Sequence, residues 1–572
     1  MGERKRATNY EVLLVAINSR YTHSNPAVYS LKAYAEQAGH SVAVAEYNIN
    51  QPVLEILKDI IGKNCQWIGF SCYIWNITIV ENLTKQLKLI FPNLNIFWGG
   101  PELSGTGPDW LQKVPEIDFL IQGEGEKAFL TLLLAQNGDY ANVPNLIWRQ
   151  SGAIVINAMG EYLDLAELPF YYREEELQQL KNRIIYYESS RGCPFHCHFC
   201  ISAREKVRYR PLELVKQDLW KLRNSGCKKI KFVDRTFNSD KKRAVAILQY
   251  LLEIYREDLC FHIEIEPGCL DETLITLLNT APPGYIQAEA GVQSLHLPTL
   301  ESIGRRHLSE GAIENIQKLL QKNNLHLHLD LIAGLPYEGI QELKQSFAGL
   351  HRLWPHYLQL GFLKILPGSI LAETAAEYDL IYQKTPPYQV LQTPWLSFEE
   401  MAKVMDVEYA VDHYYNEEYF KTALQRATTL WQQQGRAVFD FYLALSNYDR
   451  QQAGQKSLTQ RAEILYQFLS REWPEHTLFW RYSIRLDFIR RGIALPVSLH
   501  EKQELDLWKQ YQERIAICFP ALQEIPKRLW RKQISLFALP VAVAQYTPGV
   551  YAANFLQREG LWQQAKILKI AD

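Results

Sequence analysis

The sequence predicts an α/β protein over its first two thirds, followed by an all-α part. Short β-branched runs alternate with amphipathic stretches as far as residue 393, and only helical patterns follow from Pro394 onward. The 572 residues also exceed what one hydrophobic core usually organises, so we expect several domains. Apolar residues (47%) and charged residues (22%) are in the balance of a globular protein.

Residues 1–141 are expected to form a doubly wound parallel sheet. Strand patterns alternate there with segments long enough for crossover helices, one of them at about 27–37. A βαβ series of this kind gives a parallel sheet with helices on both faces. The expected strands lie at 11–16, 41–47, 67–72, 95–98 and 118–122.

Polar residues and glycines follow these strands at their carboxyl ends, where ligands of such sheets bind. A glycine at such a place lets the backbone approach a ligand closely. The alternative is that the glycines only make tight turns. The candidate ligand-binding residues are Asn18, Ser71, Cys72, Gly99, Gly100, Gly123 and Glu124.

An irregular stretch at 142–182 is interpreted as a linker, and a second βα series follows at 183–393. Its first strand, at 184–188, leads into RGCPFHCHFC, which places Cys193, Cys197 and Cys200 on one loop. Three cysteines can ligate three irons of a 4Fe-4S cluster and leave the fourth iron open. Zinc is the alternative, because His196 and His198 could complete a tetrahedral site.

The cysteine spacing C-x3-C-x2-C, with the aromatic Phe199 before the last cysteine, resembles the signature of the radical SAM superfamily. The resemblance implies a partial (β/α)6 barrel and a cluster that cleaves S-adenosylmethionine (SAM) into a 5'-deoxyadenosyl radical. The expected strands end near Val233, Pro267, Ser294, Pro336 and Gly368. The GGE motif of the superfamily has no literal counterpart. The resemblance nominates Phe199, Asp234, Glu264, Gln293 and Ser294 as SAM-binding residues.

The N-terminal part is similar to the cobalamin-binding module that precedes the barrel in one large radical SAM subfamily. The shared features are the strand ends IGFSCYIWN, WGGPE and GEGE. The resemblance implies that cobalamin binds at the strand-end residues named above. No D-x-H-x-x-G loop supplies a histidine to cobalt, and His23 and His40 are poor substitutes. A module that keeps the fold but binds no cofactor is the alternative.

Residues 394–572 are similar to a helical extension of unassigned function in some cobalamin-binding radical SAM proteins. The Trp and Tyr residues at helical spacing are interpreted as core residues. A basic run of Lys527, Arg528, Arg531 and Lys532 is interpreted as a solvated face, with phosphate or RNA as the alternative partner.

Net charge and cysteine content indicate which partners and which cellular location are expected. The net charge of -2 and the isoelectric point near 6.7 give no global basic field for nucleic acid or anionic membrane. No stretch approaches the roughly 20 apolar residues of a membrane span. Nine cysteines without a disulfide pattern favour reduced thiols, so a cytoplasmic protein is expected.

The leading functional hypothesis is a cobalamin-dependent radical SAM methyltransferase that methylates an unactivated carbon. An external one-electron reductant such as flavodoxin or ferredoxin is implied. The cluster loop and the N-terminal strand ends should then line one cavity, because the reacting groups must meet. The alternatives are a radical SAM cyclase or rearrangement enzyme, a zinc-stabilised binding protein, and a cobalamin-sensing regulator.

Overall fold

The computed structural model describes residues 10–135, 138–305, 310–500, 504–524, 526, 529–559 and 564–571. The chain forms two compact units. The first contains Met1–Leu277, Glu301–Ala312 and Leu363–Pro394, and the second contains Leu278–Leu300, Ile313–Phe362 and Trp395–Asp572.

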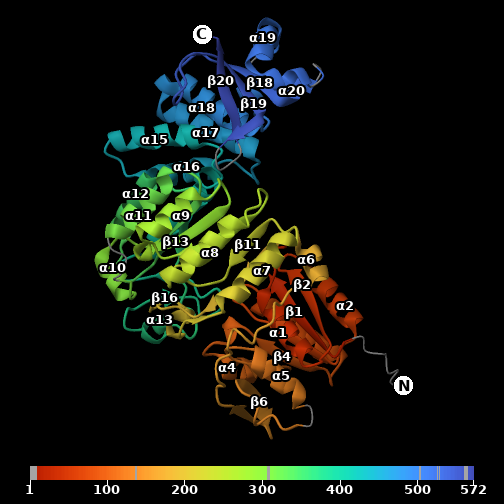
Figure 1. The fold of residues 1–572 in the computed structure, drawn as a ribbon. Helices are drawn as coiled ribbons and strands as arrows, with labels where there is room; N and C mark the ends of the chain where they lie inside the picture. The colour runs from red at the N-terminus through yellow and green to blue at the C-terminus, as the bar shows by residue number, and fades with distance from the viewer. Residues whose placement is uncertain are drawn as a thin grey trace. The chain divides into compact units, whose positions relative to one another are not determined.

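The N-terminal sheet has seven strands in the order β2-β1-β3-β4-β5-β6-β7 (Figure 1). The first five strands are parallel, as expected for a doubly wound sheet. Strand order changes direction between β1 and β3, which is where ligands of such sheets bind. The strands are β1 (Val12–Asn18), β2 (Val42–Asn48), β3 (Trp67–Ser71), β4 (Asn95–Gly99) and β5 (Phe119–Ile121), with helices α1 (Pro26–Gln37), α2 (Val53–Lys63), α3 (Ile77–Ile90), α4 (Gly107–Lys113) and α5 (Glu126–Leu134).

Two further strands extend this sheet within the stretch interpreted as a linker. β6 (Leu146–Gln150) pairs antiparallel with β5, and β7 (Ala153–Ile156) pairs antiparallel with β6. Ser151 and Gly152 join them and both have positive φ, as a two-residue hairpin turn requires. The first three residues of β6 are buried, so β6 belongs to the packed sheet. The irregular composition of this stretch did not indicate these two strands.

The second sheet has six strands in the order β15-β14-β13-β12-β11-β8, and its described pairs are parallel. This confirms the expected six-stranded partial barrel. β8, β11 and β12 belong to the first unit, and β13, β14 and β15 to the second. The strands are β8 (Ile184–Tyr187), β11 (Lys229–Phe232), β12 (Cys260–Ile265), β13 (Ile286–Gln293), β14 (His326–Ala333) and β15 (Tyr357–Phe362).

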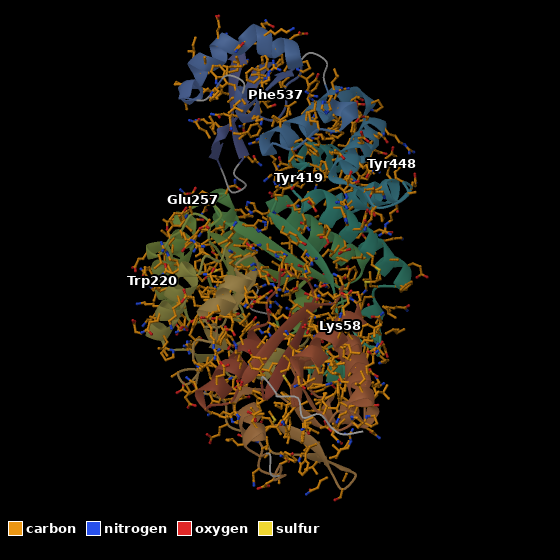
Figure 2. The ribbon with its side chains drawn as sticks, turned by 90° about the vertical axis from the view of Figure 1, so that its right-hand side faces the viewer. Lys58, Trp220, Glu257, Tyr419, Tyr448 and Phe537 are labelled. Carbon is orange, nitrogen blue, oxygen red and sulfur yellow. The ribbon has the colours of Figure 1, made fainter. Side chains whose placement is uncertain are left out.

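The C-terminal part is helical at first, but the expectation of an all-α domain is corrected at its end. A three-stranded antiparallel sheet of β18 (Ile534–Leu539), β19 (Gly549–Glu559) and β20 (Gln564–Ala571) follows the helices. Its apolar residues pack on both faces, and Phe537 stacks on Tyr551 with ring centroids 5.9 Å apart. Phe537 is labelled in Figure 2. The helices are α14 (Phe398–Ala410), α15 (Lys421–Gln433), α16 (Val438–Arg450), α17 (Leu458–Glu472), α18 (Thr477–Arg491), α19 (Glu504–Cys518) and α20 (Trp530–Gln533).

The aromatic residues of this part are mainly core residues, as interpreted from the sequence. Trp431 and Trp480 are among the largest fully buried side chains of the chain. Of the basic run, Arg531 and Lys532 are exposed on α20, whereas Lys527 and Arg528 lie outside the described residues. Among the described helices, none combines the length and the apolar character that crossing a membrane requires.

Candidate cofactor site

A cavity of about 570 Å³ lies in the first unit, where the N-terminal sheet and the start of the barrel contribute to the same wall. The strand-end loops of β1, β3, β4 and β5 line it together with residues of the cysteine loop. The strand-end loops and the barrel thus share one cavity within this unit, but the prediction that Cys193 to Cys200 line it is not met, because the lining ends at Gly192 and resumes at Ile201. Lining residues from the N-terminal part include Asn18, Ser71, Gly99, Gly100, Gly123 and Glu124, and those from the barrel include Glu188, Arg191, Gly192, Ile201, Ser202 and Glu264.

The three glycines at the cavity differ in how strictly the backbone requires them. Gly100 has φ of 114°, and a Cβ there would lie 2.6 Å from the Cys72 carbonyl oxygen. Gly123 also has positive φ, at 77°. Gly99 has ordinary φ, and its added Cβ would meet nothing closer than the Ile121 carbonyl oxygen at 3.8 Å. Gly100 and Gly123 therefore make turns, and Gly99 leaves open space beside the cavity.

Cys72 does not line the cavity, although the sequence nominated it with its neighbours. Its side chain is fully buried, and its Sγ lies 3.7 Å from the Phe70 carbonyl oxygen. Its backbone N–H donates to the Gly99 carbonyl at 2.7 Å, so it ties β3 to β4. Strand alternation explains the difference, since consecutive residues point to opposite faces.

His23 lines the cavity, whereas His40 pairs with Glu11 (Nδ1 to Oε2, 3.0 Å). The His23 Nδ1 lies 2.7 Å from the Tyr186 hydroxyl. Burial lowers the pKa of His23, and the positive charge of Arg20 adds to this effect. The imidazole is therefore neutral at physiological pH.

The cysteine loop leaves the sheet between two short strands, β9 (Ser190–Arg191) and β10 (Arg208–Tyr209), which pair antiparallel. Gly192 begins the loop with φ of 84°. A side chain is excluded there, because a Cβ would lie 2.5 Å from the Lys206 carbonyl oxygen. His196 Nδ1 lies 2.8 Å from the Ala203 carbonyl oxygen, which makes His196 a loop-stabilising residue.

The thiols of the loop lie near one another and near a buried arginine. Burial raises the pKa of the Cys197 thiol, Arg305 lowers it, and the thiols of Cys200 and Cys193 raise it. Arg305 donates to the Cys197 Sγ at 3.2 Å and to the Glu266 carboxylate at 2.7 Å. Sequence reasoning missed Arg305, since nothing in the chain order relates it to a cysteine 108 positions away.

Asp234 lies behind the cysteine loop. Its carboxylate accepts hydrogen bonds from the Ser189 N–H at 2.8 Å, the Ser189 hydroxyl at 2.5 Å and the Ser190 hydroxyl at 2.8 Å. These contacts explain the buried carboxylate without a ligand, and they hold the turn that enters the loop. Phe199 is half-buried within the loop.

Glu264 lines the cavity and pairs with Lys231, with 3.2 Å between carboxylate and ammonium. It comes from β12, and Lys231 comes from the neighbouring β11. Glu264 is therefore exposed to the cavity, and its role as a SAM-binding residue stays a prediction.

Gln293 and Ser294, both in the second unit, have different environments. Gln293 has φ of 70° at a bulge of β13, and its buried Oε1 has no hydrogen-bond donor among the described residues. A strained residue with an unused buried acceptor fits a ligand contact. Ser294 is fully buried, and its hydroxyl donates to Glu338 at 2.5 Å. Ser294 therefore serves the packing of the loop.

Glu338 gives this loop a measurable pH dependence. Burial raises its pKa from 4.5 to about 7, although hydrogen bonds from Ser294 and Ser346 lower it. The folded chain then holds a proton that the unfolded chain releases, so stability falls as pH rises from about 4.5 to about 7. We expect Glu338→Gln to flatten the fall in melting temperature over this range. The exposed Glu399→Gln variant is the control and should show the same pH dependence of melting temperature as wild type. If the melting temperature of Glu338→Gln falls with pH as steeply as that of wild type, the assignment of this pH dependence to Glu338 is contradicted.

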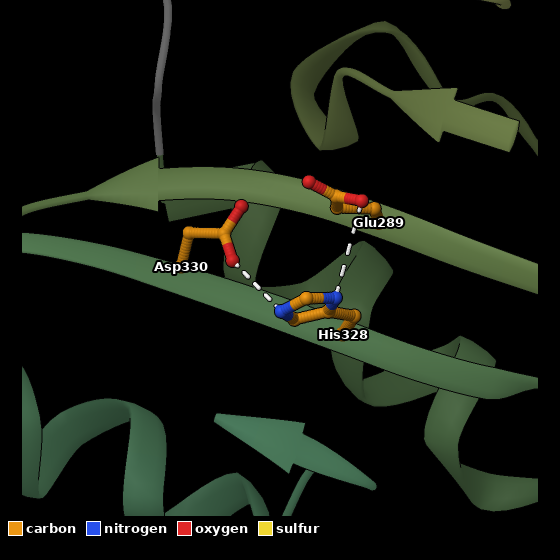
Figure 3. Close-up of side chains that lie close together, drawn as sticks. All are labelled: Glu289, His328 and Asp330. Carbon is orange, nitrogen blue, oxygen red and sulfur yellow. Dashed lines mark ion pairs between the residues drawn. The ribbon is translucent and has the colours of Figure 1, made fainter. Parts of the chain in front are cut away.

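Three polar residues of the second unit come together on β13 and β14 (Figure 3). His328 lies between two carboxylates, with Glu289 3.9 Å from Nδ1 and Asp330 3.0 Å from Nε2. His328 and Asp330 are neighbours on one strand face because of its two-residue period, and Glu289 lies opposite His328 in the parallel register. This arrangement can bind a positively charged group or hold a proton.

Family models match three successive parts of the chain. The B12 binding domain matches residues 12–133, the radical SAM superfamily matches 187–348, and a protein family of unknown function (DUF4080) matches 376–554. The chain combines a B12-binding domain with a radical SAM domain. The DUF4080 match covers most of the C-terminal helices and part of the terminal sheet.

The curated proteins that this chain matches share about a quarter of its residues over the matched parts. The cobalamin-dependent radical SAM methyltransferase TokK of Streptomyces tokunonensis is 24% identical over 60% of this chain and 53% of its own length. The anaerobic magnesium-protoporphyrin IX monomethyl ester cyclase of Synechocystis is 27% identical over 51% of this chain and 60% of its own length. The chain thus spans about half the length of the first curated relatives that it matches.

Two solved structures share the fold. TsrM from Kitasatospora setae, described with cobalamin and a [4Fe-4S] cluster bound, superposes with a TM-score of 0.55 at 16% identity over 66% of this chain and 76% of that one. OxsB, described with aqua-cobalamin and SAM bound, superposes with a TM-score of 0.58 at 15% identity. The superposition covers 88% of this chain and 75% of OxsB. At this identity, these likenesses show that the fold is shared.

Proposed function

We propose that this chain is a cobalamin-dependent radical SAM enzyme that methylates an unactivated carbon of its substrate. One observation carries the proposal: the strand-end loops of the N-terminal sheet line the same cavity as Gly192, Ile201 and Ser202, which flank the three cysteines on their loop. Radical methyl transfer requires its groups to meet, and a shared cavity provides that proximity. Its volume of about 570 Å³ lies in the range of small-molecule sites.

The residues present fit the three groups that the proposal requires. Cys193, Cys197 and Cys200 are free thiols, and three thiolates suit a cluster with one open iron. The open space at Gly99 would receive cobalamin, and Gln293 would contact SAM through its unused Oε1. When bound, the reduced cluster supplies the electron that cleaves SAM, and cobalamin supplies the methyl group. The protein orients these groups and excludes water from them.

An external one-electron donor such as flavodoxin or ferredoxin completes the proposal, because the cluster must be reduced before SAM is cleaved. A cytoplasmic location is proposed with it. Reduced thiols support this, since none of the nine cysteines is in a disulfide.

The proposal is tested by incubating reconstituted, anaerobic protein with dithionite and SAM that carries a 13C-labelled methyl group. We expect 5'-deoxyadenosine in the solution and the 13C label on cobalamin. Bound cobalamin with intact SAM would instead indicate a cobalamin-sensing regulator. Formation of 5'-deoxyadenosine without label on cobalamin would favour the cyclase or rearrangement hypothesis, which the Synechocystis relative makes specific.

A further inference from the structure

Two arginines stand at the base of the cysteine loop. Arg191 lies on β9 and Arg208 on β10, and the two residues are direct partners in the antiparallel register. Both side chains are well buried, with 13% and 17% of their surface exposed. Like charges opposite each other on paired strands repel, so the hairpin base needs compensating carboxylates.

Two carboxylates come from the N-terminal part, Glu124 from the loop after β5 and Glu126 from the first position of α5, and Glu188 also pairs with Arg191 at 2.9 Å. Glu126 binds Arg191 in a forked arrangement, with contacts of 2.5 and 3.2 Å. Glu124 binds Arg208 through both guanidinium NH groups. The Ser30 hydroxyl donates to Glu126 at 2.6 Å, which ties the pair to α1 as well.

The Arg191–Glu126 pair is ionised, and both pairs are geometrically specific. Burial raises the pKa of Glu126, but Arg191 and the Ser30 hydroxyl lower it to about 2. Forked arginine–carboxylate contacts fix orientation as well as distance, which a lysine does not do. Arg208 also donates to the Leu163 carbonyl at 2.9 Å, so its guanidinium is held from two sides.

We propose that Arg191–Glu126 and Arg208–Glu124 form a double clamp that sets the position of the cysteine loop relative to the strand-end edge of the N-terminal sheet. The two arginines are positioning residues. The clamp joins the loop that would hold the cluster to the Gly123–Glu126 loop beside the cobalamin edge, and in this respect it rests on the proposed function. Its function is to keep the distance between the two cofactors short and constant.

The clamp is tested first without cofactors, in the full-length chain, through tryptic cleavage after the exposed Lys206 of the cysteine loop. Cleavage rates report how often a segment opens. We expect Arg208→Gln and Glu124→Gln each to raise this rate by about tenfold, roughly 1.4 kcal/mol of opening free energy. The double variant should cleave more slowly than the product of the two single effects predicts, because both changes remove the Arg208–Glu124 pair.

Arg173→Gln is the matched control, since it removes the exposed Arg173–Glu36 ion pair of the same unit. Wild-type rates in both single variants, or a double-variant rate equal to the product of the single effects, would overturn the clamp. A variant that is cut at all its tryptic sites has unfolded. If Arg208→Gln unfolds in this way, Arg208→Lys takes its place in the comparison of single and double variants. The same two results would overturn the clamp.

The second readout is the cob(II)alamin EPR signal of reconstituted protein, whose relaxation is enhanced by a nearby reduced cluster. We expect the half-saturation power to fall severalfold in Arg208→Gln while iron and cobalamin contents stay at wild-type levels. An unchanged half-saturation power would contradict the clamp. A wild type that binds neither cofactor would overturn the proposed function instead, and the tryptic cycle would still decide on the clamp.

Discussion

Replacing Cys193, Cys197 and Cys200 together by alanine is expected to abolish the iron–sulfur absorbance of reconstituted protein. The three cysteines lie on one loop, and alanine at these positions leaves no thiolate to ligate iron. Iron should fall from about four atoms per chain to a background level. Absorbance spectroscopy and iron analysis of anaerobic protein measure this directly.

A matched triple variant separates loss of the site from general damage. Cys227, Cys260 and Cys269 belong to the same unit but lie outside the cysteine loop. Their replacement by alanine should leave iron and sulfide at wild-type levels. A full cluster in the variant that lacks Cys193, Cys197 and Cys200 would show that other residues ligate the iron.

Gly99→Trp is expected to weaken cobalamin binding by at least about 100-fold, roughly 2.7 kcal/mol. The backbone at Gly99 accepts a side chain without strain, so the indole would extend into space beside the cavity. Gly100 is a poorer test position, because any Cβ there meets the Cys72 backbone and disturbs the fold. Titration of the variant with hydroxocobalamin gives the dissociation constant.

Two substitutions control for effects on the fold. Gly99→Ala places a Cβ at an ordinary contact distance of 3.8 Å and should bind cobalamin nearly as wild type does. Gly62→Trp puts the same indole on α2, where no atom lies within 4 Å of the added Cβ. If Gly99→Trp binds cobalamin with unchanged affinity, the cofactor lies elsewhere.

The sequence predicted the strands of the two α/β parts well, because buried strands show as short apolar runs in the sequence. β1, for example, is apolar from Val12 to Ile17 and is buried along its whole length. The C-terminal sheet was missed because β19 and β20 mix polar and apolar residues without a strict alternation. β6 and β7 were missed because β7 is an edge strand with mostly exposed residues.

The candidate site was predictable where spacing along the chain carries the signal and not where the fold brings distant residues together. The cysteine triplet and the GEGE loop are local motifs. Arg191 and Arg208 flank the cysteine loop in the sequence, but their partners lie 65 and 84 residues away. Asp234 and Ser294 were nominated from their motif positions, and the structure shows hydrogen bonds from their polar atoms to other protein groups, which the sequence did not reveal.

Metal and cobalamin analysis of one reconstituted sample tests the central claim most directly. The wild-type chain, incubated anaerobically with iron, sulfide and hydroxocobalamin and then freed of unbound material, should contain about four irons and as many sulfides per chain. It should also retain cobalamin in a one-to-one ratio. A chain that instead holds a single zinc ion at its cysteines and releases all its cobalamin would contradict the account.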